Sequence, residues 1–85
     1  MKKESDHTYV LTLTVRNNAG VLVRCAQIFN RRGHNIEALH VAGSPESPNL
    51  SLMTITAFGK PDVIKLITLQ LKKLVDVIDV KEAEK

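Results

Sequence analysis

Residues 8–33, TYVLTLTVRNNAGVLVRCAQIFNRRG, contain the change of hydrophobic period that decides the fold. Apolar and polar residues alternate over 8–15, which predicts a β-strand with one buried face. That face consists of Tyr9, Leu11, Leu13 and Val15. Turn-forming residues follow at 17–20, and a helical period then begins, so we expect a helix from about Gly20 to the terminator Gly33. Its inner stripe is predicted to be Leu22, Cys25, Ile28 and Phe29.

The remainder of the chain supplies two further strands, a second helix and a last strand. Residues 35–41 predict a strand anchored by Ile36 and Leu39, and the loop GSPESPN separates it from a strand over 50–58. A second helix is expected to open at residues 59–62, because proline is accepted in a first turn. Its inner stripe is Val63, Ile64, Ile67, Leu71 and Leu74. The β-branched run 75–80 predicts the short final strand.

The predicted order βαββαβ indicates an α+β, ferredoxin-like fold: a four-stranded antiparallel sheet with both helices on one face. We expect one domain over 8–81 and flexible tails at 1–7 and 82–85. A domain of 85 residues has a small core, so burial of a further face in a dimer is plausible from size alone.

Composition excludes several classes of protein. The formal charge of +3 is modest and dispersed, and therefore does not require nucleic acid. One cysteine, Cys25, cannot form an internal disulfide and suits a reducing compartment, so the sequence predicts a cytoplasmic protein. No apolar run approaches the roughly 20 residues of a membrane span.

The sequence gives little support for a metal site, a nucleic-acid-binding site or a catalytic site. His7, His34 and His40 lack the ligand spacing of a metal site, and Cys25 belongs to the inner stripe of its helix. RNA-binding domains of this topology stack bases on aromatic residues of the central strands, whereas here Tyr9 and Phe58 stand at strand ends. No catalytic triad, carboxylate pair or phosphate-binding loop is present, so we predict that the chain is not an enzyme.

The joint between the first strand and the first helix, residues 16–22, is the candidate binding site. Free N–H groups at a helix start can receive a carboxylate. Gly20 allows close approach of a ligand, and Asn17 offers an amide. The alternative is that Asn17 or Asn18 only caps the helix.

Four segments in this order resemble the small subunits of acetolactate synthase, which are ACT-domain proteins. They are NNAGVLVR (17–24), RRGHNIEAL (31–39), LSLMTI (50–55) and QLKKLVDVIDV (70–80). The resemblance runs from about Tyr9 to Val80. Two departures are that Ala19 stands where ACT domains often have proline, and that many members carry a second domain, so the chain is either a short form or a fragment.

The resemblance implies a homodimer joined through its second strands into an eight-stranded sheet, with valine or a related branched-chain amino acid bound between the subunits. It implies an effector site formed by Asn17, Ala19, Gly20, Val21 and Leu22 of one subunit. Asn35 and Ile36 would come from the other. The dimer would activate a large catalytic subunit and mediate feedback inhibition, and thiamine diphosphate, FAD and magnesium would belong to that partner, with no cofactor on this chain.

Two alternatives remain open. One is an amino-acid-sensing ACT dimer that regulates a different enzyme or a transcription factor. The other is a nucleic-acid-binding ferredoxin-like domain, which would bind oligonucleotides in a salt-sensitive manner.

Overall fold

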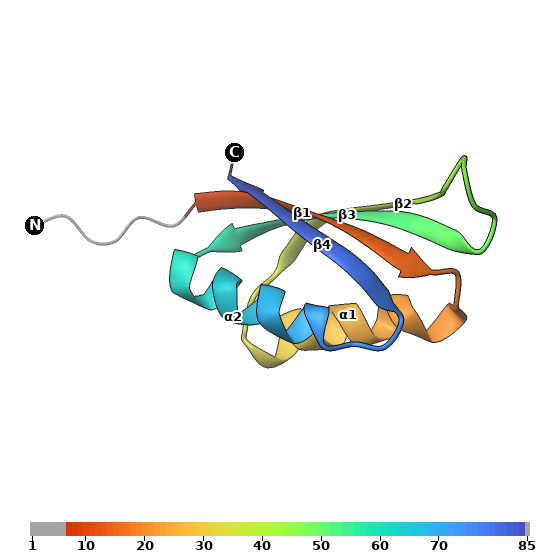
Figure 1. Cartoon of the computed structure of the whole chain (residues 1–85). Helices are drawn as coiled ribbons and strands as arrows, with labels where there is room; N and C mark the ends of the chain where they lie inside the picture. The colour runs from red at the N-terminus through yellow and green to blue at the C-terminus, as the bar shows by residue number, and fades with distance from the viewer. Residues whose placement is uncertain (1–6, 85) are drawn as a thin grey trace, which may run out of the picture.

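The computed structural model describes residues 7–84, except for the side chains of Ala19 and Glu84. It confirms the predicted order of elements and the ferredoxin-like architecture. The elements are β1 (His7–Arg16), α1 (Ala19–Arg31), β2 (Ile36–Gly43), β3 (Leu50–Gly59), α2 (Pro61–Lys72) and β4 (Val77–Glu84). The strands form one antiparallel sheet in the order β2-β3-β1-β4, and both helices cover the same face of it (Figure 1).

The central strands show why the alternation in the sequence predicted the layers. The predicted face of β1 is buried, from Tyr9 at 4% exposed to Leu11 and Leu13 at 0%. In β3 the buried set is Ser51, Met53, Ile55, Ala57 and Gly59. The inner stripe of α2 packs on these strands, with Ile64, Ile67 and Leu71 fully buried.

The inner stripe of α1 is confirmed at Cys25, Ile28 and Phe29, which are 1%, 6% and 1% exposed. The prediction is wrong at Leu22, which is 37% exposed, while Val21 beside it is 5% exposed. The physical reason is the strand order: β2 is an outer strand, so the side of α1 above it has only a partial cover. The C-terminus of the helix agrees with expectation, because Gly33 adopts a left-handed φ of 71°.

Strand β4 begins later and extends further than the sequence predicts. Val75 and Asp76 lie in a turn, and Val75 is 86% exposed. The main-chain carbonyl of Asp76 accepts from the Arg16 N–H at 2.8 Å, which holds this turn at the end of β1. The charged residues that follow continue as strand because they pair with β1 as far as Tyr9. Residues 82–84 and His7 therefore belong to strands, while residues 1–6 and 85 of the predicted tails lie outside the described part.

Candidate functional site

The β1–α1 joint is fixed by main-chain hydrogen bonds to two other parts of the chain. The Asn17 N–H donates to the Asn49 carbonyl at 2.8 Å, from the loop before β3. The Asn18 N–H donates to the Arg16 carbonyl at 2.7 Å. Together with the bond from Arg16 to Asp76, these contacts make the joint a defined structure.

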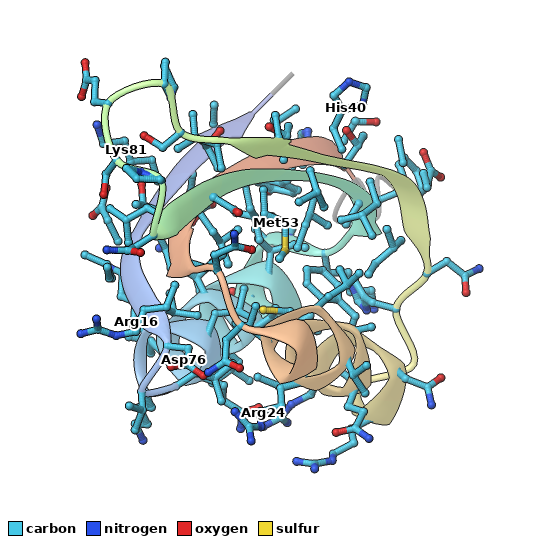
Figure 2. All side chains as sticks on the ribbon, turned by 90° about the vertical axis from the view of Figure 1, so that its right-hand side faces the viewer. Arg16, Arg24, His40, Met53, Asp76 and Lys81 are labelled. Atoms are coloured by element: carbon cyan, nitrogen blue, oxygen red, sulfur yellow. The ribbon has the colours of Figure 1, made fainter. Side chains whose placement is uncertain are left out.

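The start of α1 has no side-chain cap from the residue that precedes it. Asn18 occupies the N-cap position with extended backbone, but its side chain makes no capping bond. Instead its Nδ2 donates to Oδ2 of Asp76 at 3.2 Å, and Nη1 of Arg24 donates to the same oxygen at 3.3 Å. The Asp76 side chain is 11% exposed and that of Arg24 is 59% exposed. Figure 2 shows Asp76 and Arg24 below the end of β1.

This arrangement leaves the positive end of the α1 dipole available. The first turn of α1 contains no acidic residue, and the first N–H groups of an α-helix have no acceptor within the helix. An anion placed there is stabilised by the N–H groups and by the helix dipole. The capping alternative for Asn18 is therefore not what the structure shows.

Beside the helix start lies a hollow of about 190 Å³. Its floor is apolar, with Val15 and Met53 both 1% exposed, and its rim includes Val41, which is 51% exposed. Figure 2 shows Met53 between the sheet and α1. The complete lining is Val15, Arg16, Asn17, Asn18, Val21, Leu22, Val41, Ser51 and Met53. Ligand sites typically enclose roughly 300–1,000 Å³, so one protomer supplies part of a site.

Three of the predicted effector residues line this hollow: Asn17, Val21 and Leu22. Ala19 and Gly20 form the first turn of α1 next to it. The structure does not bring Asn35 and Ile36 to the hollow within one protomer. These two residues lie at the opposite end of β2, where the strand begins.

Ser51 is a lining residue that the sequence-based prediction missed. It is 7% exposed, and its side chain makes no hydrogen bond within the described residues. Its hydroxyl is not among the fully buried side-chain atoms without a partner in the described residues, so it is open to the hollow. The sequence did contain a signal, because Ser51 lies two and four residues before the buried residues Met53 and Ile55 and therefore on the same face of the strand.

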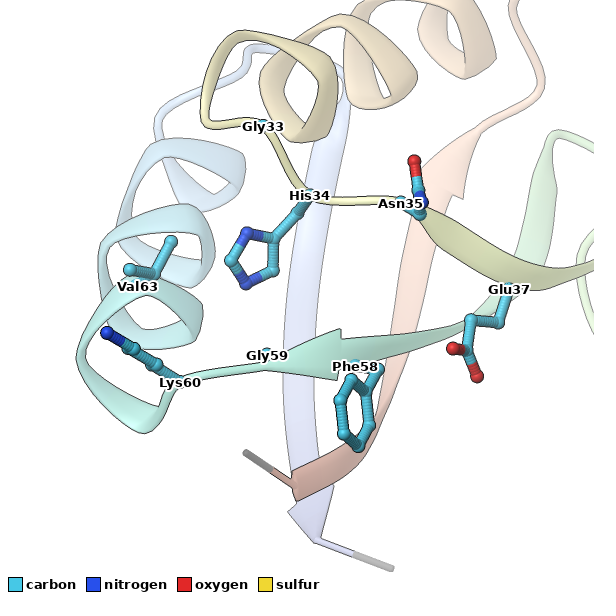
Figure 3. A pocket seen from close by; sticks show the side chains of 8 residues that line it. All are labelled: Gly33, His34, Asn35, Glu37, Phe58, Gly59, Lys60 and Val63. Atoms are coloured by element: carbon cyan, nitrogen blue, oxygen red, sulfur yellow. The ribbon is translucent and has the colours of Figure 1, made fainter. Parts of the chain in front are cut away.

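A second hollow, of about 290 Å³, lies at the start of β2 and is lined by Asn35 and Glu37 together with His34, Gly59 and Lys60 among others. The His34 imidazole lies against Gly59 (Figure 3), and a Cβ atom at that glycine would collide with it. Nε2 of His34 is buried and has no partner among residues 7–84. The tight packing shows that this imidazole fills space between β3 and the start of α2.

The outer edge of β2 is unusually exposed. Only Ile36 is partly buried; every other residue of the strand is exposed. Leu39 and Val41 pair with Ile55 and Met53, so they lie on the helix side of the sheet, yet they are 39% and 51% exposed. An apolar hollow of about 380 Å³ between Leu39 and α1 continues this surface. Unpaired strand edges of this kind readily pair with another strand.

The described residues do not support a metal site, a nucleophilic thiol or a surface on which bases could stack. Among residues 7–84, no three His, Cys, Asp or Glu side chains gather as a metal site. Burial raises the pKa of Cys25 to about 11, so its thiol is protonated at neutral pH and is a poor nucleophile. Tyr9 is buried on the inner face while Phe58 is exposed on β3 and pairs with Thr8, so the two rings share no stacking surface. Neither helix of the described chain has the length and apolar composition of a membrane span.

Comparisons with known proteins agree with this geometry. A family model described as "AHAS small subunit-like ACT domain" matches residues 11–79. The probable acetolactate synthase small subunit of Methanothermobacter thermautotrophicus is 46% identical over 77 residues, which are 91% of this chain and 45% of the relative. The acetolactate synthase isozyme 3 small subunit of Escherichia coli is 44% identical over 73 residues, which are 86% of this chain and 44% of the relative.

A solved structure extends the similarity to three dimensions. The crystal structure of the acetolactate synthase small subunit from Thermotoga maritima superposes with a TM-score of 0.77 at 36% identity. The match covers 88% of this chain and 46% of that one. The chain therefore spans a little under half the length of the relatives it matches.

Proposed function

Because the chain belongs to the family of AHAS small subunit-like ACT domains, we propose that it is a non-catalytic regulatory part of acetolactate synthase, in the biosynthesis of branched-chain amino acids. The proposal rests on the hollow at the start of α1, found in a chain that matches this family. The hollow combines an open helix N-terminus, polar side chains and an apolar floor. These are the features needed to bind a small amino acid.

The working form in this proposal is a homodimer joined through β2. The exposed edge and the aliphatic side chains of Leu39 and Val41 support such a contact. Pairing two copies of β2 antiparallel about a two-fold axis makes one continuous sheet of eight strands. It also sets the start of one β2 beside the end of the other. Asn35 and Ile36 of one protomer would then approach the hollow of its partner near Val41.

Such a dimer gives each part of the effector a chemical counterpart. The open N–H groups at the start of α1, those of Ala19 and Gly20, receive the carboxylate, since the Val21 N–H already donates to the Asn18 carbonyl at 3.1 Å. The amides of Asn17 and the partner's Asn35 orient the polar groups. The short branched side chain of valine, leucine or isoleucine contacts the apolar surface of Val21 and Met53.

The regulated enzyme in this proposal is the large catalytic subunit, which would carry the thiamine diphosphate, FAD and magnesium. The dimer would raise the activity of that subunit, and effector binding would reverse the effect. This coupling requires the effector to bind two states of the assembly unequally, typically by about 1–3 kcal/mol. Leu66 and Leu69 on the outer face of α2 are 45% and 56% exposed, and we assign the contact with the catalytic subunit to them.

Reconstitution tests this function. The chain is added to the purified large subunit of the same host, and acetolactate formation is measured with and without valine. We expect the chain to co-purify with the large subunit and to stimulate it, and Leu69→Lys to weaken both effects. Absence of co-purification and stimulation by the wild-type chain would contradict the proposed function, and unchanged co-purification of Leu69→Lys would remove the assigned docking face alone.

A further inference from the structure

We propose that Ser51 contacts the effector directly, with its hydroxyl donating a hydrogen bond to the carboxylate of the bound amino acid. This inference rests on the proposed function and adds to it a residue from the floor of the hollow. It assigns to β3 a role in recognition, in addition to the roles proposed for α1 and β2.

The position of Ser51 in the sheet is that of a core residue. It is 7% exposed and has the same orientation as Met53 and Ile55, which are 1% and 0% exposed. A side chain in this register is normally apolar, since a buried hydroxyl is unfavourable unless it is hydrogen-bonded. The described residues provide no partner for it. The chain thus keeps, at a core position of β3, a hydroxyl that has no protein partner among the described residues and that opens to the hollow.

The neighbours of Ser51 leave its hydroxyl accessible from the hollow. In register, Ser51 pairs with Val15 of β1 on one side and with Gly43 of β2 on the other. A Cβ atom added to Gly43 would meet nothing within 4 Å, so the space on that side is open. Val15 gives an apolar wall that is 1% exposed. Ser51 therefore faces the same hollow as Asn17 and Val21.

The combined lining defines the class of ligand. Hydrogen-bond donors line the hollow: the hydroxyl of Ser51, the amide of Asn17 and the N–H groups at the start of α1. The apolar side chains of Val21 and Met53 line it as well. A carboxylate attached to a short aliphatic group matches this mixed lining, which agrees with a branched-chain amino acid.

Titration calorimetry with valine compares the full wild-type chain with Ser51→Ala. We expect the Kd for valine to rise about tenfold in the variant, because one hydrogen bond to a charged group is lost. The melting temperature without valine should stay the same or rise, since the hydroxyl has no partner in the free protein. Thr54→Val is the matched control: it removes a hydroxyl from the same strand on the opposite face, and it should leave the Kd unchanged.

The outcomes separate this inference from the function on which it rests. An unchanged Kd in Ser51→Ala, beside weaker binding in Asn17→Ala, overturns the role of Ser51 and keeps the proposed site. A lower melting temperature of free Ser51→Ala would make Ser51 a structural residue and would also overturn the inference. Absence of binding by the wild-type chain to valine, leucine and isoleucine would reject the proposed effector function itself.

Discussion

Replacement of Asp76 by alanine is predicted to loosen the β1–α1 joint by a measurable amount. The carboxylate accepts hydrogen bonds from Asn18 at 3.2 Å and from Arg24 at 3.3 Å. Hydrogen bonds to charged groups contribute about 1.5–3 kcal/mol each when buried, but ion pairs with an exposed partner contribute only about 0–1 kcal/mol. The Arg24 side chain is 59% exposed and Asn18 is exposed too, so water replaces the lost acceptor. The expected loss is therefore about 1–2 kcal/mol.

Thermal unfolding followed by circular dichroism measures this loss. In a domain of this size, 1 kcal/mol shifts the melting temperature by about 4–8 °C, so Asp76→Ala should melt about 5–15 °C below the wild type. Asp79→Ala is the control, because Asp79 is an exposed acid of the adjacent strand and its loss should cost less than about 0.5 kcal/mol. A melting temperature of Asp76→Ala within about 2 °C of the wild type would refute the structural role of the carboxylate.

Three further predictions concern the dimer, the packing of β3 and the buried thiol. Leu39→Lys should turn the dimer into a monomer in sedimentation velocity, because a two-fold axis sets like charges close together at the β2 edge, while Leu69→Lys should stay dimeric. Gly59→Ala should displace the imidazole of His34 and cost about 1–3 kcal/mol in thermal unfolding; wild-type stability would contradict the packing. Burial raises the pKa of Cys25 from 9.0 to about 11, so the folded state holds its proton more tightly, and the free energy of unfolding should fall as the pH rises from 9 to 11. Cys25→Ala should lack this decline, and an equal decline in that variant would contradict the assignment.

Local pattern was sufficient for the layers of this fold. The alternation around Leu11 and Leu13 predicted which face of β1 is buried, since a strand has a side-chain period of two. Gly33 predicted the end of α1, because its left-handed φ suits glycine. In both segments the signal lies in the local sequence, although the residues that pair with β1 come from distant parts of the chain.

Features that depend on distant parts of the chain could not be predicted in the same way. Helix periodicity did not distinguish Leu22 from Val21, because their burial depends on β2 lying at the edge of the sheet. The turn at Asp76 interrupts a run with strong strand propensity, and its bonds go to residues some 50–60 positions earlier in the chain. For Ser51 the signal was local: it is a polar residue on the face of β3 that otherwise holds buried apolar residues.

The predicted site was recovered in part for a similar reason. Asn17, Val21 and Leu22 are close in sequence and line one hollow. Asn35 and Ile36 lie at the far end of β2, and only the two-fold pairing proposed above would bring them to it. Their assignment to the effector site stays a prediction.

The most direct test is the binding of valine to the wild-type chain and to the Leu39→Lys variant, measured by titration calorimetry at concentrations where sedimentation shows dimer and monomer respectively. Leu39 does not line the hollow at the start of α1, so the variant leaves each protomer's own contribution intact. If the site is completed by the second protomer, the dimer binds one valine per protomer and the monomer binds at least tenfold more weakly. Equal affinity in the monomer would contradict a shared site.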